Sequence, residues 1–287
     1  MRSKSLKFVM AMTCGLMAVA GIAAAKDQGT PATPRIIRYP ARGIADSVGT
    51  EQHLLAKATN LSNHGGPVIT NAHVVFIFWG SFPAGYTSTL QSFRNQFGTN
   101  GEYNTITQYS GSNGTVALSN LAGGSADWFD TTTPPHAVTD SIVQNEVNAY
   151  LLTHAFDANA IYEVVIPSSS YSDDGTGATS CGGPFLQYCA YHSWIGSGTS
   201  ATKYSIQPYP SCSGCRVSGW SDVQNQEHFV THETREAVTD PTGSTWFDSS
   251  GAEADDKCAW SPSPFLVSGF GYQYEWSNAS RACVKTR

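Results

Sequence analysis

Six cysteines lie between residues 181 and 283, and they constrain the fold of this chain more than any other feature. An even set of cysteines in an exported chain is typical of disulfide bonds, which fix distant segments to one another. The spacing does not determine the pairing, but closeness along the chain favours three local bonds. These bonds are Cys181–Cys189, Cys212–Cys215 and Cys258–Cys283. We therefore expect a loop-rich C-terminal part that is held together by disulfides.

The motif from Cys212 to Cys215 has a second interpretation as a redox pair or a zinc knuckle, because two residues separate its cysteines. A thioredoxin-like redox site needs a strand before the motif and a helix that begins at it. Here Pro208 and Pro210 precede the motif, which is typical of a loop. The sequence therefore favours a structural disulfide.

Residues 1–25 have the pattern of a secretory signal peptide. Three basic residues stand near the start, residues 8–20 are mainly apolar, and a run of three alanines that ends at Ala25 fits a cleavage site. A membrane anchor is the alternative, but it requires about 18 or more apolar residues, and this run is shorter. We expect export to the extracellular space, the periplasm or the cell wall, and no membrane span in the mature chain.

The 262 of 287 residues that follow the leader carry a clear excess of negative charge. Loss of Arg2, Lys4 and Lys7 with the leader leaves 13 of the 16 Lys and Arg residues against 22 Asp and Glu residues, a net charge of −9. Surfaces that bind nucleic acid are basic, so this balance argues against a nucleic-acid partner.

The mature chain begins with residues 26–63, which are polar, contain Pro31, Pro34 and Pro40, and show no clear periodicity. We expect an extended arm there, or a pro-segment. A single globular domain is expected over residues 64–287, a length that suits one large core.

Apolar runs and helical periodicity predict the core of that domain. Strands are predicted at residues 74–79 and 161–166, and helices at residues 88–97, 141–151 and 221–239. Residues 168–220 are rich in Ser, Gly, Tyr and Cys, which predicts loops and short strands. This order indicates an α+β domain with a mixed sheet, in which the second helix backs the sheet and the third carries the site.

The third predicted helix contains the segment with the clearest chemistry, residues 232–236, which read His-Glu-Thr-Arg-Glu. At about 100° per residue, His232 and Glu236 lie one turn apart on the same side and can bind one metal ion. Zincins use a similar arrangement, in which the histidines of His-Glu-x-x-His bind zinc and the glutamate is a general base. We therefore expect His232 and Glu236 as ligands and Glu233 as the catalytic base.

The two sides of this helix differ in chemistry. An apolar face carries Val223, Val230, Ala237 and Val238, whereas His228, His232 and Glu236 fall on roughly the opposite face. His228 is a further candidate ligand. It lies two turns from Glu236, about 12 Å along the axis, so we do not expect one ion to bind both.

The segment after this helix resembles that of thermolysin-like enzymes, which take a third ligand, a glutamate, from a later segment. Glu253 lies 17 residues after Glu236 and matches that ligand. In those enzymes a nearby aspartate orients a ligand histidine, so the resemblance implies that Asp256 contacts the second nitrogen of His232. The reserve candidates are Asp240 and His192.

Two other interpretations of these residues remain. Glu233, Arg235 and Glu236 are also typical of an exposed helix face with ordinary surface charges. Four acids near the end of the candidate site offer the oxygen ligands that calcium prefers. These acids are Asp248, Glu253, Asp255 and Asp256.

Several short motifs occur in the same order as in the exordium-like (phosphate-induced protein 1) proteins, and the chain resembles that family from about residue 64 to residue 260. The motifs are His64-Gly65-Gly66-Pro67-Val68, Cys189-Ala190-Tyr191-His192-Ser193, His232-Glu233 with Glu236, Thr239-Asp240-Pro241, Trp246, and Glu253 with Asp256 and Cys258. Members are secreted proteins of plants, with looser relatives in bacteria. The resemblance implies an extracellular or cell-wall location but brings no established reaction. Thr234 and Arg235 differ from the plant members, which are more apolar there.

Together these features predict a secreted metal-dependent hydrolase, with a zinc metallopeptidase as the leading interpretation. We expect one zinc ion on a zincin-like scaffold, with calcium as the other candidate ion. The expected substrate is an extracellular protein or peptide. The alternative is a non-catalytic extracellular protein of exordium type, with a structural metal or with none.

Overall fold

The computed structural model describes residues 34–44 and 59–287, which belong to one unit of the chain, Pro31–Arg287. The signal peptide expected at residues 1–25 lies outside the described residues. Within the described residues, no helix combines the length and the apolar character that a membrane span requires.

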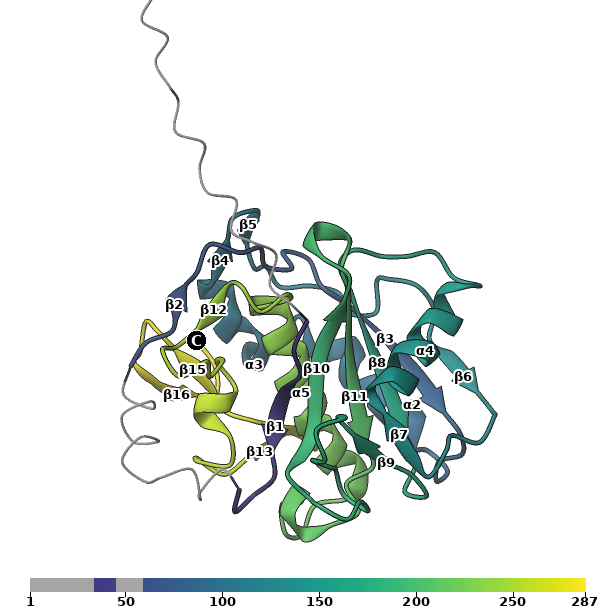
Figure 1. Ribbon diagram of the computed structural model, residues 1–287. Coiled ribbons are helices and arrows are strands. Elements are labelled where there is room, and N and C mark those ends of the chain that lie inside the picture. Colours follow the sequence, from purple (N-terminus) through teal and green to yellow (C-terminus); the bar gives the residue numbers. More distant parts are fainter. Residues whose placement is uncertain (1–33, 45–58) are drawn as a thin grey trace, which may run out of the picture. The chain divides into compact units, whose positions relative to one another are not determined.

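A six-stranded mixed sheet forms the centre of this unit (Figure 1). Its strand order is β1-β10-β11-β8-β3-β6. The pairs β11–β8, β8–β3 and β3–β6 are parallel, whereas β10 is antiparallel to both β11 and β1. The strands are β1 (Ile37–Pro40), β3 (His73–Trp79), β6 (Trp128–Asp130), β8 (Ala160–Ile166), β10 (Tyr188–Ile195) and β11 (Thr202–Pro208).

Helices cover both faces of this sheet. α2 (Tyr86–Phe97) and α5 (Asp222–Thr239) pack on one face, and α4 (Asp140–Leu151) packs on the other. Successive residues of β3 point to opposite faces, so Phe76 joins the core beneath α2 and α5, and Ile77 joins the core beneath α4. A strand that is buried on both faces explains the continuous apolar run in the sequence.

Short elements surround this three-layered centre. The short helix α3 (Gly101–Asn104) and four 3₁₀ turns, Thr105–Gln108, Gly198–Ser200, Ser213–Cys215 and Asp256–Cys258, lie in its connections. The described residues also form five two-stranded sheets. Their strands are β2 (Ser62–Asn63) with β12 (Trp246–Phe247), β4 (Ser110–Gly111) with β5 (Gly114–Thr115), β7 (Ala137–Thr139) with β9 (Tyr171–Asp173), β13 (Phe265–Val267) with β14 (Phe270–Tyr272), and β15 (Glu275–Ser277) with β16 (Ala282–Val284).

The α+β class and the mixed sheet are confirmed, as are the predicted strands β3 and β8 and the three predicted helices. The prediction for residues 168–220 is wrong in one respect, because this region contains β10 and β11, two long strands of the central sheet. Both strands bury polar side chains, among them His192, Ser205 and Gln207. These polar residues interrupt the apolar pattern by which buried strands are recognised.

Part of the expected N-terminal arm belongs to the domain. β1 is extended, as expected, but it pairs with β10 along the edge of the sheet, with Ile37 opposite His192 and Tyr39 opposite Ala190. Residues 34–44 therefore belong to the folded domain, which begins earlier than the expected boundary at residue 64.

The six cysteines form three disulfides, as expected, but two of the predicted pairings are wrong. The bonds are Cys181–Cys212, Cys189–Cys215 and Cys258–Cys283. The turn Ser213–Cys215 lies against the region of β10, so Cys215 and the preceding Cys212 bond to two different residues elsewhere in the chain. Since Cys212 and Cys215 are both bonded elsewhere, their interpretation as a redox pair or zinc knuckle does not hold.

Candidate metal centre

Helix α5 carries the candidate centre and is buried along most of its length. A capping box begins it, in which the Ser221 hydroxyl accepts from the Gln224 N–H and the Gln224 side chain accepts from the Ser221 N–H. Every residue from Asn225 to Thr239 is buried. The interpretation of this helix as an exposed, charged surface face is therefore wrong.

His232 and Glu236 point toward each other on one side of α5, as predicted. Nε2 of His232 lies 3.1 Å from Oε2 of Glu236. The main-chain N–H of Asp256 donates to the other oxygen, Oε1, of Glu236 at 2.8 Å. Within the described part of the chain, neither Nε2 of His232 nor Oε2 of Glu236 has a hydrogen-bond partner. Both atoms are thus available to bind an ion.

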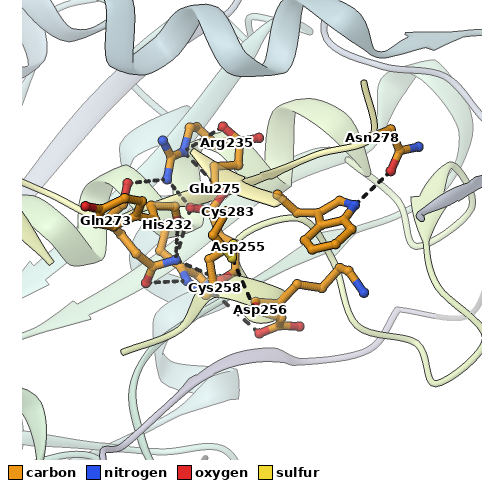
Figure 2. The surroundings of a disulfide bond; sticks show 12 residues. His232, Arg235, Asp255, Asp256, Cys258, Gln273, Glu275, Asn278 and Cys283 are labelled. Atoms are coloured by element: carbon orange, nitrogen blue, oxygen red, sulfur yellow. Dashed lines mark hydrogen bonds and ion pairs between the residues drawn. A yellow bond between two sulfur atoms is a disulfide. The ribbon is translucent and has the colours of Figure 1, made fainter. Parts of the chain in front are cut away.

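Gln273, and not Asp256, contacts the second nitrogen of His232. Nδ1 of His232 lies 3.2 Å from Oε1 of Gln273, and in the tautomer that donates this bond Nε2 keeps its lone pair. Oδ1 of Asp256 instead lies 3.7 Å from Nε2, the nitrogen that faces Glu236. Figure 2 shows Gln273 and Asp256 beside His232. The Gln273 amide also donates to the main-chain oxygen of Asp255, which orients it.

Strand β10 brings His192, a reserve candidate, into the centre. Nδ1 of His192 lies 2.9 Å from Oε2 of Glu233 and 3.8 Å from Oε2 of Glu236. Nε2 of the same ring lies 3.8 Å from Oε2 of Glu253, which the loop after β12 supplies. His192 therefore links the two glutamates of α5 to the glutamate of the later loop.

Two sets of three buried side chains each place one ligand atom within 4.8 Å of the others. The first set is His192, Glu236 and Glu253, and the second is His232, Glu233 and Glu236. The predicted ligands His232, Glu236 and Glu253 are thus divided between the two sets, and Glu236 belongs to both.

The electrostatics of this cluster favour a bound cation. Oε1 of Glu233 and both carboxylate oxygens of Glu253 have no hydrogen-bond partner among the described residues. Burial, with neighbouring carboxylates, raises the pKa of Glu233 and Glu253 well above the usual range, and burial raises the pKa of Glu236 to about 8. A cluster of buried carboxylates is costly when more than one is charged, so these groups need either protons or a cation among them. Burial also lowers the pKa of His192 to about 3, which keeps this ring neutral, the form that binds metals.

A second buried network adjoins the cluster (Figure 2). Nε of Arg235 lies 3.2 Å from Oδ2 of Asp255 and 3.4 Å from Oε2 of Glu275. Nη2 of Arg235 donates to the main-chain oxygen of Gln273 at 3.1 Å. Arg235 therefore holds the segment that orients His232, a role that its place in the motif did not indicate.

Two reserve candidates lie outside both ligand sets. Nδ1 of His228 contacts the Tyr39 hydroxyl at 3.3 Å, and His228 joins neither set. Oδ1 of Asp240 accepts the main-chain N–H groups of Ser244 and Thr245, so Asp240 stabilises the turn after α5.

Two of the four acids considered for calcium are paired with buried basic residues. Oδ2 of Asp248 accepts from Nζ of Lys257 at 3.0 Å, and Asp255 accepts two bonds from Arg235. A carboxylate that is paired with a basic side chain is a poorer ligand for a metal ion. The structure therefore supports a calcium site at these four acids less strongly than the sequence does.

β1 and the residues before it cover the cluster, a role that sequence reasoning missed. The ring of Tyr39 stacks on the ring of His232. Nη2 of Arg35 lies 3.7 Å from Oε1 of Glu253 and 3.9 Å from Oδ2 of Asp240. The β-favouring residues of this short stretch were a signal for a strand, but the nearby prolines favoured a loop.

No family model matches this chain, and neither the curated proteins nor the solved structures contain a match to it. The resemblance to exordium-like proteins therefore stays a prediction. The geometry of the cluster is the main support for a function.

Proposed function

We propose that this protein is a secreted metal-dependent hydrolase that cleaves peptide bonds, with zinc as its ion. The observation that carries the proposal is the 3.1 Å separation of Nε2 of His232 and Oε2 of Glu236, two buried atoms without a hydrogen-bond partner in the described part of the chain. Ligands about 2.0 Å from a tetrahedral ion lie about 3.3 Å apart, so this pair has the spacing of ligands that share one zinc ion.

Glu253 completes the proposed donor set of His232, Glu236 and Glu253, which leaves a tetrahedral zinc ion one open position for water. Glu253 lies in one ligand set with Glu236 and His192, and it is fully buried beside them. One imidazole with two carboxylates suits zinc, which binds nitrogen and oxygen donors. A second carboxylate in place of a histidine also admits harder ions such as manganese.

Glu233 is the proposed general base. A divalent ion bound by His232, Glu236 and Glu253 would supply a Lewis acid and would lower the pKa of a nearby water molecule. Oε2 of Glu233 is held by Nδ1 of His192 at 2.9 Å, while Oε1 has no partner among the described residues. One oxygen is thus fixed and the other is available to take a proton, which is the arrangement that general-base catalysis needs. His192 is a positioning residue in this account, because it orients Glu233.

The extracellular setting is part of the proposal. The leader-like pattern of residues 1–25 supports export, and disulfides persist mainly in oxidising compartments. The resemblance to exordium-like proteins supports the same location. An extracellular protein or peptide is then the proposed substrate.

A non-catalytic role has one specific observation in its favour. Structural metal sites are closed, whereas catalytic sites keep an open position. The side chains of His232, Glu236 and Glu253 are each 0% exposed. On this alternative, an exordium-type protein binds the ion only to stabilise its fold.

Substitution of Glu233 separates the two functions. We expect Glu233→Gln to keep its metal and to lose turnover of a peptide library by at least about 100-fold. Glu227→Gln is the matched control, because Glu227 is buried on the same helix but belongs to neither ligand set. Unchanged turnover in Glu233→Gln contradicts the assignment of the base. If both the wild type and an Arg35→Ala variant bind metal but do not cleave the peptide library, the non-catalytic role is favoured.

A further inference from the structure

β1 is a four-residue edge strand that pairs with β10 on one side only. Ile37 lies opposite His192, and Tyr39 lies opposite Ala190. Directly opposed residues of an antiparallel pair point to the same face of the sheet. Ile37 and Tyr39 therefore point to the face of His192, the face on which α5 packs, and Figure 1 shows β1 between β10 and the C-terminal elements, over α5.

Tyr39 fills an aromatic slot on this face. Its ring stacks on His232, with 4.2 Å between centroids, and on Trp260, with 5.2 Å between centroids. Its hydroxyl contacts Nδ1 of His228 at 3.3 Å, and the side chain is 0% exposed. The slot therefore has contacts for both the flat ring and the hydroxyl group of a tyrosine.

Arg35 places a positive charge at the other end of the same segment. Its Nη2 lies 3.7 Å from Oε1 of Glu253 and 3.9 Å from Oδ2 of Asp240. The Arg35 side chain is 42% exposed, whereas the two acids are 0% exposed. Arg35 thus lies between solvent and an acid pair, one member of which is a proposed ligand.

A substrate cannot reach the cluster while this segment is in place, because the proposed ligands are fully buried beneath it. Departure of β1 from the sheet would leave three features side by side: the free edge of β10, the aromatic slot of Tyr39 and the acid pair beneath Arg35. A free strand edge binds an extended peptide by main-chain hydrogen bonds, and pockets for alternate side chains give specificity.

We propose that this edge of β10, with the slot and the acid pair, is a binding site for an extended peptide, and that β1 occupies it as a strand of the same chain. The peptide that fits carries a basic residue and, four positions later, an aromatic residue, as Arg35 and Tyr39 do. The inference rests on the proposed function only for cleavage of that peptide, since strand pairing itself needs no metal.

Several features make β1 easier to displace than its neighbours. It is short, and it lies at the edge of the sheet. Pro40 has no N–H to donate, and the pairing shifts register between Tyr39 and Pro40. Elements with few partners open locally, without unfolding of the whole domain.

Hydrogen exchange on the full wild-type chain tests the displacement without any substitution. We expect the amides of Ile37 and Tyr39 to exchange at least about 100-fold faster than those of Val164 in β8, because β8 opens only on global unfolding. Equal exchange rates in β1 and β8 would show that β1 leaves only when the domain unfolds, and would overturn the inference.

Peptide binding tests the site itself. The probe is a labelled synthetic peptide with the sequence of residues 34–41, and the full-length proteins are wild type, Arg35→Ala and the control Arg281→Ala at the exposed β15–β16 turn. We expect Arg35→Ala to bind the peptide about 10-fold more tightly than wild type, because its own strand competes less. Arg281→Ala is expected to match wild type. Because the Arg35 side chain is 42% exposed, we expect the Arg35→Ala variant to fold.

Changes in the peptide test the specificity. Replacement of the peptide's tyrosine by alanine should weaken binding to Arg35→Ala about 10-fold, since the slot is then empty. No saturable binding to Arg35→Ala, or equal binding of a peptide with scrambled sequence, overturns the inference. The proposed function can fail separately. Binding of the peptide without any metal would support the peptide site and contradict the metal-dependent hydrolase. Binding of metal without any peptide would contradict the peptide site alone.

Discussion

The ring of Tyr39 stacks on the imidazole of His232, with 4.2 Å between centroids and 18° between planes. Tyr39 belongs to the edge strand β1 and His232 to helix α5, so this contact joins the start of the described chain to the candidate metal centre. Stacked aromatic pairs contribute about 0.5–1.5 kcal/mol beyond their buried area. The stack also excludes water from one face of the proposed ligand.

Substitution of Tyr39 by phenylalanine should preserve this stack and remove only the hydroxyl contact with His228. We expect Tyr39→Phe to lower the free energy of unfolding by about 1 kcal/mol, the usual value for one hydrogen bond, with no change in metal content. Urea denaturation measures the effect. Tyr39→Ala is the comparison, and an equally large loss in both variants would contradict a role for the ring.

Arg235 should be among the most sensitive positions of the chain, because it forms ion pairs with two buried acids, Asp255 and Glu275. We expect Arg235→Met to cost about 3–5 kcal/mol of stability, since it leaves two buried carboxylates without their partner. Arg216→Met is the matched control, because the ion pair of Arg216 with Asp222 is about one-third exposed. A surface pair contributes about 0–1 kcal/mol. Similar losses in the two variants, measured by denaturation, would contradict the buried network.

The stability of the protein should fall with rising pH because of Glu227. Burial raises the pKa of this carboxyl to about 8, and its Oε1 has no hydrogen-bond partner in the described part of the chain. The folded state therefore binds the proton more tightly than the unfolded state, whose pKa is about 4.3. This stabilisation is complete below about pH 4.3 and is lost as the pH rises through about 8.

Glu227→Gln cannot titrate and should lack this part of the pH dependence. Between pH 5 and pH 9, we expect the stability of Glu227→Gln relative to wild type to rise by about 2–4 kcal/mol. The other titrating groups are common to both proteins and cancel in the difference. A constant or falling difference, in denaturation curves at each pH, would contradict the burial of a protonated carboxyl.

The disulfide pairing is open to a direct chemical check. Peptide mapping without reduction should recover Cys181 linked to Cys212 and Cys189 linked to Cys215. Replacement of Cys181 and Cys212 together by alanine should lower stability by about 2–4 kcal/mol, because that bond joins residues 31 positions apart. Recovery of a peptide with Cys181 linked to Cys189 would contradict the fold around β10.

The core was predictable wherever burial follows a local period. The apolar run of β3 and the spaced apolar residues of α4 and α5 identify those elements. β10 and β11 were not predictable in this way, because side chains such as His192 and Gln207 are polar yet buried. Strands that bury a polar cluster therefore lack the apolar pattern by which buried strands are recognised.

The site was predictable only where its geometry is local. His232 and Glu236 lie one helical turn apart, so their meeting follows from the spacing alone. Gln273, Tyr39 and Arg35 reach the same place from other segments, and no spacing rule relates them to α5. The contact of Gln273 with His232 depends on the arrangement of the C-terminal hairpins, which only the folded structure provides.

The metal content of the purified mature protein tests the central claim most directly, with wild type, His232→Ala and His228→Ala measured side by side. His228 is the matched control, since it is equally buried on the same helix but belongs to neither ligand set. We expect about one zinc ion per chain in wild type and in His228→Ala, and close to none in His232→Ala. An absence of metal in wild type, or an equal content in His232→Ala, would contradict a metal centre on α5.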